Sequence, residues 1–96
     1  MTHAERMRIS YVDWRILIHG SIRRSHIMET FGVSESQASI DINEFRRLYP
    51  DALRYDLTAK QYVPANGRYR SVTGWTQRRA EAWAAAHVAG IEWAWG

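Results

Sequence analysis

The 96-residue sequence contains no cysteine, and only one of its thirteen basic residues is a lysine. Without cysteine there is neither a disulfide framework nor thiolate chemistry, which is typical of a cytoplasmic protein. No apolar run approaches the roughly 20 residues of a membrane span, and the N-terminus lacks the apolar core of a secretory signal. The length suffices for one domain but not for a second independent core. We therefore expect a single-domain cytoplasmic protein that does not enter the membrane.

Residues for catalysis or metal binding are also sparse. None of the four histidines belongs to an HExxH motif or a Cys/His cluster, so no zinc site is predicted. Asp13 and Glu44 have neither a carboxylate partner at a useful spacing nor a nucleophile nearby. His26 has two possible roles, a phosphate contact or an ordinary surface histidine. We predict no enzyme, no cofactor and no small-molecule effector.

The basic residues that are present suit phosphate binding. The formal net charge is +3, and nearly all of the cations are arginines. The guanidinium group binds phosphate oxygens through two parallel hydrogen bonds, which an ammonium group cannot do. This composition favours a nucleic-acid partner.

A helix is predicted between Ser34 and Tyr49. Ser34, followed three residues later by Gln37, is a capping box in which each side chain satisfies a backbone N–H at the helix start. Pro50 ends the helix because it disfavours the α conformation in the residue before it. At 100° steps, one arc has the 4-3-4 spacing of a buried face, formed by Ala38, Ile42, Phe45 and Tyr49.

The opposite arc of this helix is a candidate reading face. It carries Ser36, Ser39, Ile40, Asn43 and Arg47. Small polar side chains can approach base edges in the major groove, and Ile40 suits a thymine methyl group. A solvated helix face is the alternative, because single exposed isoleucines are common. This helix alone does not decide between the two interpretations.

Two further helices are predicted before it, over Ala4 to His19 and about Arg24 to Phe31. The first has two apolar stripes, so both of its sides must be covered; the stripes are Ile9, Val12 and Ile16, and Met7, Tyr11, Trp14 and Ile18. Ile22 pairs briefly between the helices. The second helix turns Ile27, Met28 and Phe31 inward and ends at Gly32. Its N-terminus, with Arg23 and Arg24, suits a phosphate, and the pair of helices around Gly32 predicts a helix-turn-helix.

A small hairpin, or wing, is predicted after Pro50. Its strands are Leu53 to Asp56 and Gln61 to Val63, with Leu53 and Tyr55 on one face and Tyr62 packing across the pair. Arg54 and Lys60 then reach a phosphate or the minor groove. A plain solvated hairpin is the alternative for both residues.

The rest of the chain is predicted as a linker, residues 65–75, and an Ala/Trp-rich helix within residues 76–96. Its tryptophans are a large aromatic surface for so small a chain, which indicates a homodimer interface. The candidate interface residues are Trp83, His87, Val88, Ile91, Trp93 and Trp95. The alternative is that the helix packs entirely on the second stripe of the first helix.

Three joint motifs, GxIRRxHI, FGVSxxQASxDI and YDxxAKxYV, resemble the N-terminal winged helix-turn-helix of WYL-domain transcriptional regulators of the BrxR and CapW type. DeoR repressors are more distantly similar. The resemblance implies base or phosphate contacts by Ser36, Gln37 and Ser39, and backbone contacts by Arg24 and Lys60. Asp41 matches an acidic position of the pattern and is expected to be structural. Such regulators continue into a ligand-sensing domain. We therefore expect the chain to be either a naturally short, constitutive DNA binder or one part of a longer regulator.

The overall prediction is a mainly α protein with a small β-hairpin: a winged helix-turn-helix over residues 1–64, a linker and a C-terminal dimerisation helix. Its predicted function is sequence-specific double-stranded DNA binding by a transcriptional repressor of phage-defence or mobile-element genes, as a homodimer on half-sites about one helical turn apart. The predicted DNA contacts are Arg23, Arg24, Ser36, Gln37, Ser39, Ile40, Asn43, Arg46, Arg47, Arg54 and Lys60. The alternative is a protein-interaction or adaptor module in a nucleoprotein assembly.

Overall fold

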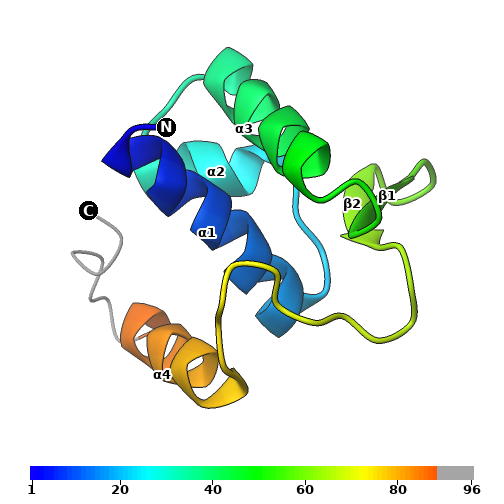
Figure 1. Cartoon of the computed structure of the whole chain (residues 1–96). Coiled ribbons are helices and arrows are strands. Elements are labelled where there is room, and N and C mark those ends of the chain that lie inside the picture. The colour runs from blue at the N-terminus through cyan, green and yellow to red at the C-terminus, as the bar shows by residue number, and fades with distance from the viewer. Residues whose placement is uncertain (89–96) are drawn as a thin grey trace.

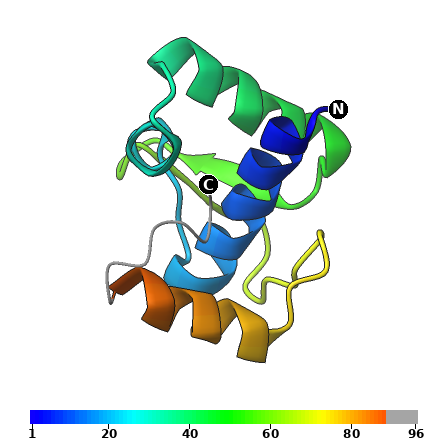
Figure 2. The same cartoon turned by 90° about the vertical axis from the view of Figure 1, so that its left-hand side faces the viewer.

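The computed structural model describes residues 1–88, which form four helices and one hairpin (Figure 1). In chain order the elements are α1 (His3–His19), α2 (Arg24–Phe31), α3 (Glu35–Leu48), β1 (Leu53–Asp56), β2 (Gln61–Pro64) and α4 (Gln77–Val88). Figures 1 and 2 show α3 and α4 on opposite sides of α1. The predicted class, mainly helical with a small hairpin, is confirmed. No helix in the described part of the chain is long and apolar enough to cross a membrane.

Helix α1 lies at the centre because both of its apolar stripes are covered. Ile9, Val12 and Ile16 are buried, as are Tyr11 and Trp14 from the other stripe. Contacts with α2 and α3 cover one side, and α4 covers the other. The two-sided burial predicted from the sequence is therefore confirmed.

The turn between α2 and α3 has the predicted geometry at its two ends. Gly32 takes a left-handed conformation (φ 67°) and donates its N–H to Met28 O at 2.8 Å. Ser34 Oγ accepts the N–H of Gln37 at 3.1 Å and caps α3. The predicted capping box is wrong in its second half, because Gln37 Nε2 donates to Asp41 Oδ1 at 3.0 Å. A carboxylate one turn further along offers the amide a charged acceptor.

The hairpin is antiparallel, with Leu53 opposite Pro64 and Asp56 opposite Gln61. Asp56 Oδ1 accepts the N–H groups of two turn residues, Thr58 and Ala59, at 3.0 and 3.1 Å. The predicted pairing of Ile22 is confirmed, because Ile22 and Tyr62 exchange two backbone hydrogen bonds of 3.0 and 2.9 Å. This bridge fixes the hairpin beside the start of α2.

Segment 65–75, predicted as a linker, is held against α1 by a buried carboxylate. Asp13 is fully buried. It accepts hydrogen bonds from Tyr69 Oη (2.7 Å), Ser71 Oγ (2.6 Å), Val72 N (3.2 Å), Thr73 N (2.9 Å) and Thr73 Oγ1 (2.5 Å). Burial first, and then the bond to Asp13, raise the pKa of the Tyr69 phenol above its usual range. The segment has no regular structure, but it is an attached part of the domain and not a free connector.

Helix α4 packs on the second stripe of α1, which was the alternative to a dimer interface. Ala80 is completely buried, and its carbonyl accepts the indole N–H of Trp14 at 2.9 Å. Trp83 packs against the same core and meets Trp75 edge to face, with ring centroids 6.1 Å apart. The other candidate interface residues cannot be compared with this packing, because they lie outside the described part of the chain. This applies to the side chains of His87 and Val88 and to the whole of Ile91, Trp93 and Trp95. The dimer interface stays a prediction.

Candidate nucleic-acid interface

The outward face of α3 is the surface on which the predicted DNA contacts depend. Ile40 is 59% exposed, Ser36, Asn43 and Arg47 are exposed, and Ser39 is half-buried. The opposite face is buried through Ala38, Ile42 and Phe45, as the 4-3-4 spacing predicts. The core therefore sets the rotation of the helix so that this face points to solvent.

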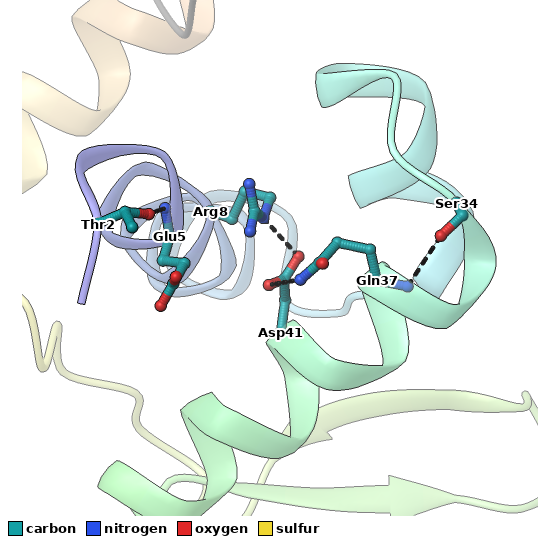
Figure 3. A network of polar contacts seen from close by, with 6 residues as sticks. All are labelled: Thr2, Glu5, Arg8, Ser34, Gln37 and Asp41. Atoms are coloured by element: carbon teal, nitrogen blue, oxygen red, sulfur yellow. Dashed lines mark hydrogen bonds and ion pairs between the residues drawn. The ribbon is translucent and has the colours of Figure 1, made fainter.

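A buried ion pair links α3 to α1 and adds to this control of rotation. Arg8 Nε donates to Asp41 Oδ2 at 2.7 Å, and the two side chains are only 11% and 4% exposed (Figure 3). Gln37 occupies the other carboxylate oxygen, Oδ1. The predicted structural role of Asp41 is confirmed. The Gln37 amide lies toward Asp41 in Figure 3, and the base or phosphate contact that the resemblance implied for Gln37 stays a prediction.

The reading face borders a groove of about 530 Å³ between the start of α2, α3 and the hairpin. Three cations, Arg23, Arg24 and Lys60, and one carboxylate, Glu35, line this groove. Asn43 and Ser39 line it from α3. The groove therefore joins the positive start of α2 to polar side chains of the reading face and to the hairpin.

Arg23 connects this groove to the hairpin. Its Nη2 donates to the carbonyl of Ala59 in the hairpin turn at 3.1 Å. Lys60, which follows Ala59, has a left-handed backbone (φ 55°), and its side chain is exposed. The contact keeps two cations from distant parts of the sequence beside each other.

The arginines of the last turn of α3 have different partners. The guanidinium of Arg46 lies over the ring of Tyr62, 5.2 Å from its centroid. Arg47 donates to both oxygens of Glu44, at 3.0 and 2.5 Å, and this hydrogen bonding lowers the pKa of Glu44. The carboxylate of Glu44 thus partly offsets the charge of Arg47, whereas Arg46 places its charge over an uncharged ring of the hairpin. Arg54 is exposed on β1.

His26 caps the start of α2, a role that the sequence did not indicate. Its Nδ1 accepts the backbone N–H of Arg23 at 3.0 Å, and its Nε2 lies 3.2 Å from Arg15 Nη2. Burial first, and then the charge of Arg15, lower the pKa of His26, while Glu29 opposes this shift. His26 is therefore not an ordinary surface histidine, and the other interpretation, a phosphate contact, stays a prediction.

The lowered pKa of His26 predicts a pH dependence of stability. The unfolded state binds a proton near pH 6.5 and the folded state only at lower pH, so stability is complete above about pH 6.5 and is lost as the pH falls below it. We expect the thermal midpoint to fall between about pH 7 and pH 5.5, and to fall less in His26→Gln. His3→Gln, at the exposed start of α1, is the matched control and should keep the wild-type profile. Identical profiles for the wild type and His26→Gln would contradict this role.

No group of three His, Cys, Asp or Glu side chains in the described part of the chain is placed to hold a metal ion. The groove is lined instead by cations, small polar groups and the carboxylate of Glu35, and the exposed side chain of Ile40 lies on the same helix, α3. These are the groups that contact phosphates and base edges.

Helices α1 to α3, with a hairpin that is hydrogen-bonded through Tyr62 to Ile22 just before α2, define a winged helix-turn-helix. The chain belongs to the family of the BrxR transcriptional regulator winged helix-turn-helix domain, whose model matches residues 4–73. The match includes most of segment 65–75, in agreement with its attachment to α1.

Three similar proteins are named DNA-binding transcriptional repressor CapW. The one from Escherichia coli strain KTE188 is 40% identical over 55 residues, which are 57% of this chain and 18% of that protein. The Pseudomonas aeruginosa protein has the same identity and coverage. The one from Stenotrophomonas maltophilia is 33% identical over 75 residues, 78% of this chain and 23% of that protein. The chain thus spans less than a quarter of the length of these relatives.

Proposed function

We propose that the chain is a sequence-specific double-stranded DNA-binding transcriptional regulator and that α3 enters the major groove. The observation that carries this proposal is the exposed face of α3 beside a groove with three cations. Asn43 can bond to N6 and N7 of adenine, and Ile40 can contact a thymine methyl group. Ser36 and Ser39 are small enough to let the helix approach the bases.

Phosphate contacts on either side of α3 complete the proposal. Arg23 lies at the N-terminus of α2, where backbone N–H groups and the helix dipole also favour an anion. Arg46, Arg54 and Lys60 extend the positive surface toward and along the hairpin. Several such contacts predict that affinity falls steeply with salt concentration.

The proposal also includes repression as the mode of regulation and a homodimer as the form that binds DNA. The printed names of the relatives support repression. A cytoplasmic homodimer with α3 of each copy in successive major grooves would read two half-sites about 34 Å apart. No effector is required for this binding mode.

Asn43→Ala tests direct readout. We expect it to weaken binding to the preferred duplex by about 5- to 150-fold, the loss of one good side chain to base contact, with little change on unrelated DNA. The preferred site is first selected from a random pool, and affinities are then measured by fluorescence anisotropy. Asn66→Ala, the same exchange at an exposed position in segment 65–75, is the matched control.

Two outcomes would contradict the proposal. Equal affinities of Asn43→Ala and Asn66→Ala for the selected site would show that Asn43 does not read bases. Absence of DNA binding by the wild type, together with a stable protein partner, would favour an adaptor module instead.

A further inference from the structure

Arg24 is the first residue of α2, but its guanidinium lies on α3. Its Nη1 is 3.2 Å from Oε1 of Glu35 and 3.3 Å from Oγ of Ser39. These two partners are one turn apart on α3, at the end that the proposed function directs toward the bases. The side chains of Arg24 and Glu35 are 55% and 64% exposed, so the pair is open to a ligand.

The contacts leave one edge of the guanidinium available. Nη1 donates a hydrogen bond to Ser39 Oγ, and the same nitrogen forms the ion pair with Glu35. No other partner of this guanidinium is found among the residues that the structure describes. The N–H of Nε and one N–H of Nη2 are parallel donors, and this pair fits two acceptors such as O6 and N7 of guanine.

The charge of Glu35 favours a base over a phosphate as the ligand of Arg24. The Glu35 carboxylate, 3.2 Å away, offsets part of the charge of this guanidinium and disfavours a second anion beside it. Guanine presents neutral acceptors and is not repelled to the same extent. Arg23 forms no ion pair with a carboxylate among residues 1–88, and its Nη2 donates to the Ala59 carbonyl. The two adjacent arginines therefore face different acceptors.

We infer that Arg24 is a specificity-determining residue that reads a guanine in the major groove, and that Glu35 and Ser39 are its positioning residues. This inference rests on the proposed DNA-binding function. It replaces the backbone contact that the family resemblance implied for Arg24.

The test uses the DNA site selected by the wild-type chain and a set of duplexes in which each base pair is changed in turn. Arg24→Ala should abolish the preference for G·C at one position of each half-site, a preference of about 5- to 150-fold, and keep the other preferences. Arg24→Lys keeps the charge but not the two parallel donors, so it should lose the same preference. For both variants, the slope of log affinity against log salt should stay at the wild-type value.

Two further variants provide controls. Arg23→Ala removes the same charge one residue away and should weaken binding to every duplex equally, with a salt slope that is smaller by about 0.9. Glu35→Gln keeps a hydrogen-bond acceptor but removes the repulsion. It should strengthen binding to duplexes that lack the guanine, and so reduce the preference for G·C over other base pairs at that position.

The outcomes separate this inference from the proposed function. If Arg24→Ala behaves like Arg23→Ala, with a uniform loss and a smaller salt slope, then Arg24 is a phosphate contact and the inference is overturned while DNA binding stands. A wild-type chain that binds no duplex would overturn both. Circular dichroism of each variant shows that the exposed substitutions leave the fold unchanged.

Discussion

Asp13→Ala is expected to lower the free energy of unfolding by about 3–5 kcal/mol, because it removes the buried, charged acceptor of five hydrogen bonds. The carboxylate is fully buried and accepts five hydrogen bonds from residues 69–73. Domains of this size are stable by about 5–15 kcal/mol, so the loss is a large fraction of the total. Asp13→Asn keeps the shape but places an amide group among donors, and we expect a smaller loss.

Urea unfolding followed by circular dichroism and tryptophan fluorescence measures this effect. Asp51→Ala, at an exposed aspartate before β1, should change stability by no more than about 0.5 kcal/mol. The m-value adds information, because it scales with the surface exposed on unfolding. A lower m-value in Asp13→Ala would show that segment 65–75 is already detached in the folded state. Equal stabilities of Asp13→Ala and Asp51→Ala would show that the segment contributes little.

The fold and the exposed face of α3 were predictable because their signals are local. Gly32 and Ser34 mark the turn, Pro50 marks the end of α3, and the spacing of its apolar residues shows which face is buried. Each of these signals acts within a few residues of the feature that it predicts. Helix period and cap chemistry are therefore enough to orient the reading face.

The role of Asp13 was not predictable in this way because its partners lie 56 to 60 residues away. The donors are common loop residues, Ser71 and Thr73 among them, in a stretch that has the composition of a linker. One signal was present: Asp13 stands between Val12 and Trp14, which belong to the two apolar stripes of a helix covered on both sides. A carboxylate in such a position must find donors from elsewhere in the chain.

The candidate site was predicted as a set of residues but not as a set of interactions. The sequence places Glu35 and Glu44 near the arginines without showing which arginine each one binds. The structure pairs Glu35 with Arg24 and Glu44 with Arg47, and leaves Arg46 on the ring of Tyr62. These pairings decide which arginines have a carboxylate that offsets their attraction for phosphates. They depend on how α2, α3 and the hairpin pack.

Asp41→Ala is expected to destabilise the protein by about 3–5 kcal/mol, because it leaves the guanidinium of Arg8 buried without its partner. Glu44→Ala removes a carboxylate of α3 that pairs with Arg47 on the same helix, but that pair is exposed, so we expect little change. Urea unfolding of both variants compares a buried ion pair with an exposed one on the same helix. Equal effects would contradict the importance assigned to burial.

The double variant Arg8→Met/Asp41→Leu separates the stability of the pair from its role in orienting α3. Replacement of both charges by apolar side chains of similar volume is often neutral for stability, and we expect it to recover most of what Asp41→Ala loses. It also frees Gln37, because Asp41 is the acceptor of its amide. If the pair also sets the rotation of α3, the folded double variant will bind the selected DNA site more weakly than the wild type while its stability is similar. A double variant with wild-type affinity would show that the apolar face of α3 orients the helix without the ion pair.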